Sequence, residues 1–224
     1  MPEHTGVTSL SDGLRNIDAL QVSHNSFTEL ITPMKFVGCG TSMMCFSFDA
    51  DRVAVIPYFN NIGQGAIRTT IQNLLQSGVV APSDCELLDF SLWSLNRLTA
   101  SEYQNEADAY EDIIKLRAAN HNAAFCRMPI VHSDYVVHTY PINTFIQVDG
   151  ALCGYIMKKV PGRSHYSVPQ EVIDIYEQLD SLREPQNIYG YCDKDGIHNI
   201  FLIDFGSNRL VPSDPHSNSQ GKHM

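Results

Sequence analysis

Two oxygen-bearing side chains near the end of the chain have the chemistry of ligands for a hard cation. Asp204 follows the apolar residues 200–203 and precedes Phe205 and Gly206, and Asn187 lies upstream of it. Carboxylate and amide oxygens are both common ligands of Mg2+. A carboxylate at the end of an apolar strand can hold such an ion, and the alternative interpretation of Asp204 is a strand-end turn residue.

A second candidate lies in the segment Gly38-Cys39-Gly40, which Thr41 follows. Small residues between two strands allow backbone N–H groups to approach phosphate oxygens. The segment lacks the full GxGxxG pattern, and the alternative interpretation is an ordinary glycine turn.

The elements that position these residues follow from the apolar periodicity. Residues 35–59 predict an antiparallel meander of three strands, with the glycines in its first turn and a tight turn at residues 49–51. Residues 67–78 have helical spacing and a stop signal at Gly78. The segment from there to Leu98 is predicted to be irregular.

A longer helix is predicted to start near residue 99, with Thr99 or Ser101 as its N-cap, and to continue through residue 120. Two strands follow, and Asp149-Gly150 between them favours a tight hairpin turn.

Beyond a break at residues 160–162, a helix capped by Ser167 is predicted over residues 167–182. A second hairpin, turning at residues 193–196, then joins Asn187 to Asp204. Residues 1–30 are interpreted as a lead-in, and residues 213–224 as a disordered tail.

Composition narrows the classes of function. The chain has 224 residues, 43% of them apolar and 18% charged, with a formal charge of -10. It should therefore fold, and its charge makes nucleic acid an unlikely main partner. It contains no apolar stretch of about 18 residues and no signal-peptide pattern. The scattered cysteines favour a reducing compartment and argue against structural zinc, so we expect a cytoplasmic protein.

The order of three strands, helix, two strands, break, helix, hairpin and Asp-Phe-Gly resembles the protein kinase family. The matching segments lie between about residues 35 and 210: GCGTSMMCF, VAVIP, NEADAYEDI, IMKKVPG, PQNI and LIDFG. The resemblance implies an α+β fold, a minimal kinase-like bilobal one. Its N-lobe would be residues 31–160, with an insertion at 60–100, and its truncated C-lobe would be residues 161–212.

The resemblance also implies ATP and Mg2+ as cofactors and assigns a role to several residues. Glu106 would be the helix glutamate, and Asn187 and Asp204 the metal ligands. The nucleotide would contact Gly38, Gly40, Thr41, Met157 and Val160.

The amide ligand has an alternative, Asn199, with Asp193 or Asp195 as the catalytic carboxylate. We prefer Asn187, because the kinase arrangement needs a hairpin between the Asn and the metal Asp. Asn199 lies only five residues before Asp204, which leaves no room for a turn between two strands.

The sequence departs from the family at the third strand. An active kinase carries a Lys there that contacts the phosphates and pairs with the helix Glu. Here Val55 or Ile56 stands in its place. Arg52, at the strand start, is a doubtful substitute because its planar fork differs from a compact ammonium.

A second departure concerns the catalytic loop. Counting back from Asn187 places Leu182 where the catalytic Asp belongs, and Asp180 is two residues too early. Asp180 in a bulged loop, Glu184 or Asp193 could accept a proton only from a changed geometry.

Few residues follow Gly206, so no activation segment or large helical lobe is expected. In this the chain is similar to truncated kinase-like effectors that bacteria deliver into host cells. The insertion at residues 60–100 is a candidate surface for a protein partner, and the alternative is a packed extra helix.

Three functions follow from these observations. The chain is an active atypical kinase for a host-protein hydroxyl, a pseudokinase that binds a partner, or an unrelated α+β interaction or hydrolytic domain using Cys126 with His132 or His138. We favour the pseudokinase, because phosphoryl transfer depends on positioning and charge stabilisation and two charged groups are missing. No local signature activates Cys126.

Overall fold

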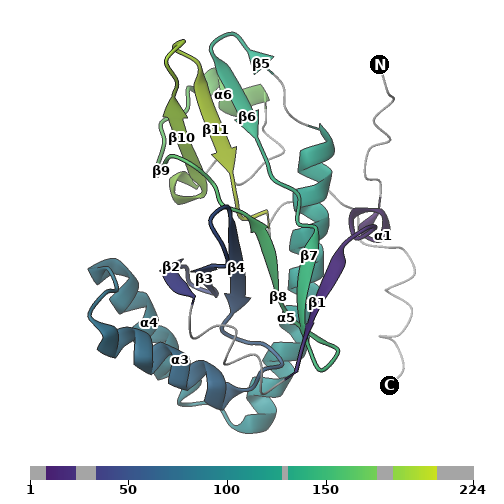
Figure 1. The fold of residues 1–224 in the computed structure, drawn as a ribbon, viewed down its shortest axis with the longest axis vertical. Coiled ribbons are helices and arrows are strands. Elements are labelled where there is room, and N and C mark those ends of the chain that lie inside the picture. The colour runs from purple at the N-terminus through teal and green to yellow at the C-terminus, as the bar shows by residue number, and fades with distance from the viewer. Residues whose placement is uncertain (1–8, 24–33, 128–130, 176–183, 206–224) are drawn as a thin grey trace. The chain divides into compact units, whose positions relative to one another are not determined.

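The computed structural model describes residues 9–23, 34–127, 131–175 and 184–205 (Figure 1). The chain divides into two compact α+β units, each assembled from separate segments. The six-stranded unit contains residues 17–114 and 143–159, and the five-stranded unit contains residues 1–16, 115–142 and 160–224. The α+β class predicted from the sequence is confirmed.

The six-stranded unit is built on one sheet with the strand order β1-β7-β8-β4-β3-β2. All neighbouring strands are antiparallel except β1 and β7. The predicted three-strand meander is confirmed as β2, β3 and β4. The bounds are β1 Asp18–Val22, β2 Lys35–Cys39, β3 Met43–Ser47, β4 Arg52–Pro57, β7 Thr144–Val148 and β8 Ala151–Lys158.

The predicted tight turn joins β7 to β8. Asp149 has a φ of 50° and Gly150 a φ of 87°, so both central residues are in the left-handed region. Two such residues define the turn whose twist matches that of the flanking strands, which explains the Asp-Gly sequence at this point.

Strand β1 lies in the segment that the sequence predicts to be a lead-in, so that prediction is wrong for residues 18–22. β1 pairs in parallel with β7, a strand far away in the sequence. Most of its side chains are exposed or half-buried. An edge strand of this kind lacks the apolar alternation by which a strand is recognised.

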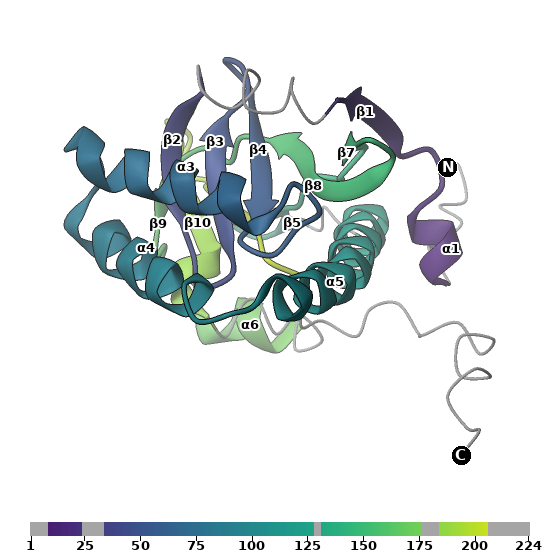
Figure 2. The same ribbon diagram turned by 90° about the horizontal axis from the view of Figure 1, so that it is seen from below.

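Helices α3, Gln64–Ser77, and α4, Pro82–Leu95, lie across one face of this sheet, as Figure 2 shows. α3 and its stop at Gly78, which has a φ of 68°, are confirmed. The irregular structure predicted for the next segment is wrong, because residues 82–95 are helical. Apolar side chains are spread around α4, so no single stripe marks it as a helix. The helices share one core with the sheet: Met44, Phe46, Ala54, Ile56, Ile67, Ile71, Leu88 and Leu95.

Helix α5, Ala100–Arg127, begins with a reciprocal cap. The backbone N–H of Glu102 donates to Thr99 Oγ1 at 3.3 Å, and the backbone N–H of Thr99 donates to Glu102 Oε2 at 2.7 Å. Thr99 is thus the N-cap, one of the two residues predicted for that role.

The five-stranded unit has the strand order β5-β6-β11-β10-β9. The predicted second hairpin is confirmed as β10 and β11, whereas β5 and β6 were not predicted. β6 pairs in parallel with β11, which is why residues 115–142 cluster with the C-terminal segments rather than with the contiguous range 31–160. The bounds are α1 Leu10–Gly13, β5 Val131–His132, β6 Tyr135–His138, β9 Arg163–Ser164, α6 Gln170–Ile175, a 3-10 turn Pro185–Asn187, β10 Ile188–Cys192 and β11 His198–Leu202.

Candidate functional site

Asn187 and Asp204 lie at the open end of the β10–β11 hairpin. Ile188 is paired with Leu202, and one residue further the backbone N–H of Ile203 donates to the carbonyl of Asn187 at 3.1 Å. The hairpin thus brings the backbone around these two residues together, as the preference for Asn187 over Asn199 requires.

Asp204 has an unusual backbone conformation. Its φ is 60°, in the left-handed region that few non-glycine residues adopt. Such a conformation costs about 1–3 kcal/mol and persists only where surrounding contacts hold it, a situation common at functional sites.

One of these contacts is an ion pair with helix α5. The Nη1 atom of Arg117 lies 3.0 Å from Oδ1 of Asp204. The Arg117 side chain is 12% exposed and that of Asp204 is 40% exposed. The predicted metal ligand therefore already has a cation beside it.

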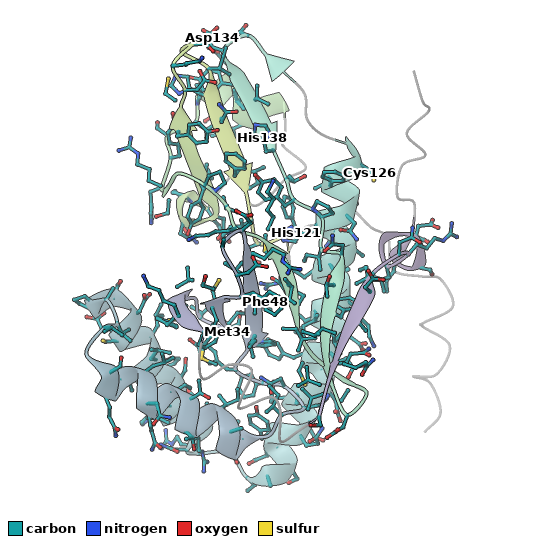
Figure 3. The ribbon with its side chains drawn as sticks, viewed as in Figure 1. Met34, Phe48, His121, Cys126, Asp134 and His138 are labelled. Carbon is teal, nitrogen blue, oxygen red and sulfur yellow. The ribbon has the colours of Figure 1, made fainter. Side chains whose placement is uncertain are left out.

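Two further side chains of α5 hold the next residue, Phe205, which is fully buried. Asn120 Nδ2 donates to the Phe205 carbonyl at 3.0 Å. The ring of His121, labelled in Figure 3, meets the Phe205 ring edge to face, with centroids 4.6 Å apart. Arg117, Asn120 and His121 are three and four residues apart, so they share one face of the helix.

The buried His121 is held neutral. Burial and the neighbouring Arg117 charge together lower the pKa of its imidazole to about 3, while the backbone of Tyr140 acts in the opposite direction. Among these α5 side chains, Arg117 therefore supplies the positive charge at neutral pH.

The donor set does not fit Mg2+ as it stands. Asp204 Oδ1 faces a guanidinium, and Asn187 Nδ2 donates to Glu184 Oε2 at 3.0 Å. Across the described residues, no three His, Cys, Asp or Glu side chains converge on one point. A magnesium ion prefers several oxygen ligands, and a neighbouring cation repels it.

The glycine turn joins β2 to β3 in the six-stranded unit. The N–H of Gly40 donates to the carbonyl of Met43 at 2.9 Å, which closes the turn. A Cβ built on Gly38 would lie 3.8 Å from Oδ2 of Asp84 on α4. A carboxylate at this place repels phosphate, so the geometry favours the ordinary-turn interpretation.

The other predicted nucleotide contacts belong to different units. Thr41 is exposed next to the glycine turn, and Met157 is buried in β8 opposite Val53 of β4. Val160 belongs to the five-stranded unit. Their roles in binding a nucleotide remain predictions.

The position of the missing lysine is apolar on both faces of β4. Ile56 is 1% exposed and packs in the core with α3 and α4, whereas Val55 is 9% exposed and points to the other face. Arg52 forms an ion pair with Asp49 across the β3–β4 turn, in which Nη2 of Arg52 lies 2.6 Å from Oδ2 of Asp49. Arg52 is thus engaged in a turn and does not replace the lysine.

Asp193 has a structural environment. Its carboxylate accepts hydrogen bonds from the N–H groups of Asp195 and Ile197 at 2.9 and 3.0 Å and from Asn199 Nδ2 at 3.2 Å. These hydrogen bonds lower its pKa. The same hydrogen bonds hold the turn between β10 and β11. A carboxylate with a lowered pKa binds a proton weakly, so Asp193 is a poor proton acceptor.

Three other predicted residues have the following surroundings. Glu106 lies on the exposed face of α5 in the six-stranded unit. His138 contacts Asn199 Oδ1 at 2.9 Å and stacks on Phe201. Cys126 is half-buried on α5 (Figure 3). Asp180 and Leu182 lie outside the described residues, as does the side chain of His132.

Sequence reasoning missed Arg117, Asn120 and His121. Their spacing in the Arg-Ala-Ala-Asn-His segment is a signal, because three polar side chains on one helix face interrupt a run that is otherwise rich in alanine.

No family model, curated protein or solved structure matches the chain. In the described part of the chain, no helix combines the length and the apolar character needed to cross a membrane.

Proposed function

We propose that the chain is a minimal, degenerate kinase-like domain that acts by binding a protein partner and does not transfer phosphate efficiently. The element order supports the kinase-like part of this proposal. A three-strand meander, the helix α5 and the β7–β8 hairpin precede a second hairpin that ends at a strained Asp204. The meander and β7–β8 share one sheet, as two adjacent pieces of one lobe should.

The buried Ile56 supports the loss of phosphoryl transfer. A kinase stabilises the transferring phosphoryl group almost entirely through positioned charges. Ile56 lies in an apolar core with Ile67 and Leu88, where a lysine ammonium would be desolvated.

The observation that carries the partner-binding role is an exposed aromatic pair on α4. Phe90 is 65% exposed and Trp93 54% exposed. Their rings are stacked with centroids 5.9 Å apart, and the Arg97 guanidinium lies 4.3 Å from the Trp93 ring centroid. Large exposed aromatic side chains are enriched at binding sites and cost solubility elsewhere.

The opposite face of α4 gives this pair a rigid base. Leu88 and Leu95 are buried in the core of the six-stranded unit. The insertion is therefore both a packed element and the carrier of an exposed patch, which combines the two alternatives that the sequence left open.

The exposed acidic side chains of α4 indicate the chemistry of the partner. Glu86 and Asp89 are exposed on the same helix, and the chain carries a formal charge of -10. Charge complementarity favours a protein surface that presents a basic side chain next to an apolar one.

The test is photo-crosslinking from the surface of α4. A benzophenone amino acid replaces Phe90 in the full chain, and the matched control carries it at Phe125, which is 46% exposed on α5. The probe is a set of model helical peptides with Lys/Arg next to Leu/Phe, alongside acidic peptides of the same length. We expect the probe at position 90 to crosslink to the basic peptides. We expect the Trp93→Ala substitution to abolish this crosslinking. Equal crosslinking from position 125, or a crosslinked dimer of the chain alone, would overturn the proposal.

A further inference from the structure

We infer that Arg117 takes the place of a divalent cation at Asp204, so that this end of β11 is a metal-independent site. The inference rests on the kinase-like interpretation of Asp204 proposed above. It concerns the five-stranded unit, whereas the partner surface lies on α4 in the six-stranded unit, so the two can fail separately.

The position of the guanidinium is fixed by its neighbours on α5. Asn120 and His121 hold the backbone and ring of Phe205, and Arg117 holds the carboxylate of the preceding residue. Three contacts from one helix face to two consecutive residues leave the guanidinium little freedom to withdraw. The Arg117 side chain is only 12% exposed, which also limits its screening by water.

The charge of Arg117 is permanent. A guanidinium remains protonated at every pH at which a protein is folded. Its Nη1 atom is 3.0 Å from Asp204 Oδ1. A metal ion bound to Oδ1 of Asp204, at about 2.1 Å, would lie within about 5 Å of this nitrogen. The repulsion between a dication and a guanidinium at that distance opposes metal binding.

The other predicted ligand, Asn187, does not offset this repulsion. Asn187 can offer one neutral amide oxygen, while its amide nitrogen is committed to Glu184. A neutral oxygen contributes less to Mg2+ or Mn2+ binding than a second carboxylate. The arrangement therefore stabilises a negatively charged Asp204 without a metal.

The experiment measures Mn2+ binding to the full chain by the loss of the free Mn2+ electron paramagnetic resonance signal. The variants are Arg117→Gln, Arg117→Lys, Asp204→Asn and the double variant Arg117→Gln/Asp204→Asn. We expect no binding by the wild type at millimolar Mn2+ and none by Arg117→Lys, which keeps the charge. Arg117→Gln should gain at least about tenfold in affinity, and the double variant should lose this gain.

Two results overturn the inference. One is wild-type Mn2+ binding that Asp204→Asn removes, which would strengthen the kinase-like interpretation while showing that the guanidinium does not exclude metal. The other is a folded Arg117→Gln variant that gains no affinity. Circular dichroism shows whether the Arg117→Gln variant is folded. If it is unfolded, the test is the NMR spectrum of the wild type with added Mn2+, which broadens the amide signals near a bound ion. Broadening centred on Asp204 would contradict the inference, and its absence would support it.

Discussion

Nη1 of Arg117 lies 3.0 Å from Oδ1 of Asp204, which joins the C-terminal half of α5 to the second residue after β11. In the family that the sequence resembles, the helix reaches the phosphates through a glutamate and a strand lysine. Here the helix contacts the aspartate directly and with the opposite charge. α5 thus presents a positive charge to Asp204.

This ion pair should be measurable as a coupling energy. A double-mutant cycle on Arg117→Gln and Asp204→Asn, followed by urea unfolding, should give about 1–3 kcal/mol, the range of hydrogen bonds to charged groups. Asn tolerates the left-handed conformation of Asp204, so the backbone strain is kept constant. Additive effects of the two substitutions would show that the pair contributes nothing.

His121 should make stability depend on pH. Its pKa is about 3 in the folded chain against an ordinary value of 6.5. Between these values the unfolded chain binds a proton that the folded chain does not, so the free energy of unfolding falls as the pH falls below about 6.5. The slope from this residue is about 1.4 kcal/mol per pH unit at most.

The control for this dependence is His121→Leu, which cannot titrate. Urea unfolding at several pH values between 7 and about 5 should show a shallower decline for this variant than for the wild type. Parallel curves for the two proteins would contradict the assignment.

Gly154 should not tolerate a side chain. A Cβ on Gly154 in β8 would collide with the backbone carbonyl oxygen of Val55 in β4, which cannot move without breaking the sheet. We expect Gly154→Ala to lower the free energy of unfolding by about 2 kcal/mol or more. Gly40→Ala is the matched control, because no atom lies within 4 Å of its Cβ. An equal loss of unfolding free energy in the two variants would contradict the close approach of Gly154 in β8 to Val55 in β4.

The two faces of α4 should respond differently to truncation. Phe90→Ala and Trp93→Ala should change the free energy of unfolding by less than about 0.5 kcal/mol, because both side chains are exposed. Leu88→Ala removes a side chain that is 0% exposed and should cost about 2–5 kcal/mol. Large destabilisation by the aromatic substitutions would mean that the patch is structural rather than a binding surface.

Local signals in the sequence predicted much of the fold. Asp149-Gly150, the Thr99 cap and the Gly78 stop each depend on the conformation of a few adjacent residues, and the structure has all three. Strands β1, β5 and β6 could not be found in this way. β1 and β6 depend on pairing with strands far along the chain, and β5 spans only two residues.

The candidate site was only partly predictable for a related reason. Asn187 and Asp204 stand out because a hairpin connects them within a short segment. Arg117 lies within the predicted helix, but it reaches Asp204 only because α5 packs against β11 and its continuation. No pattern within either segment specifies that contact.

The most direct test of the account is the thermal unfolding midpoint of the full chain in the presence of ATP with Mg2+, compared with ATP and a chelator. A ligand that binds the native state raises the unfolding midpoint. If Arg117 rather than a metal neutralises Asp204, no Mg2+ binds there, so the midpoint with ATP should be the same with Mg2+ as with the chelator. A midpoint that rises only when ATP and Mg2+ are both present, and falls back in Asp204→Asn, would show a metal-bridged nucleotide at Asp204 and contradict the account.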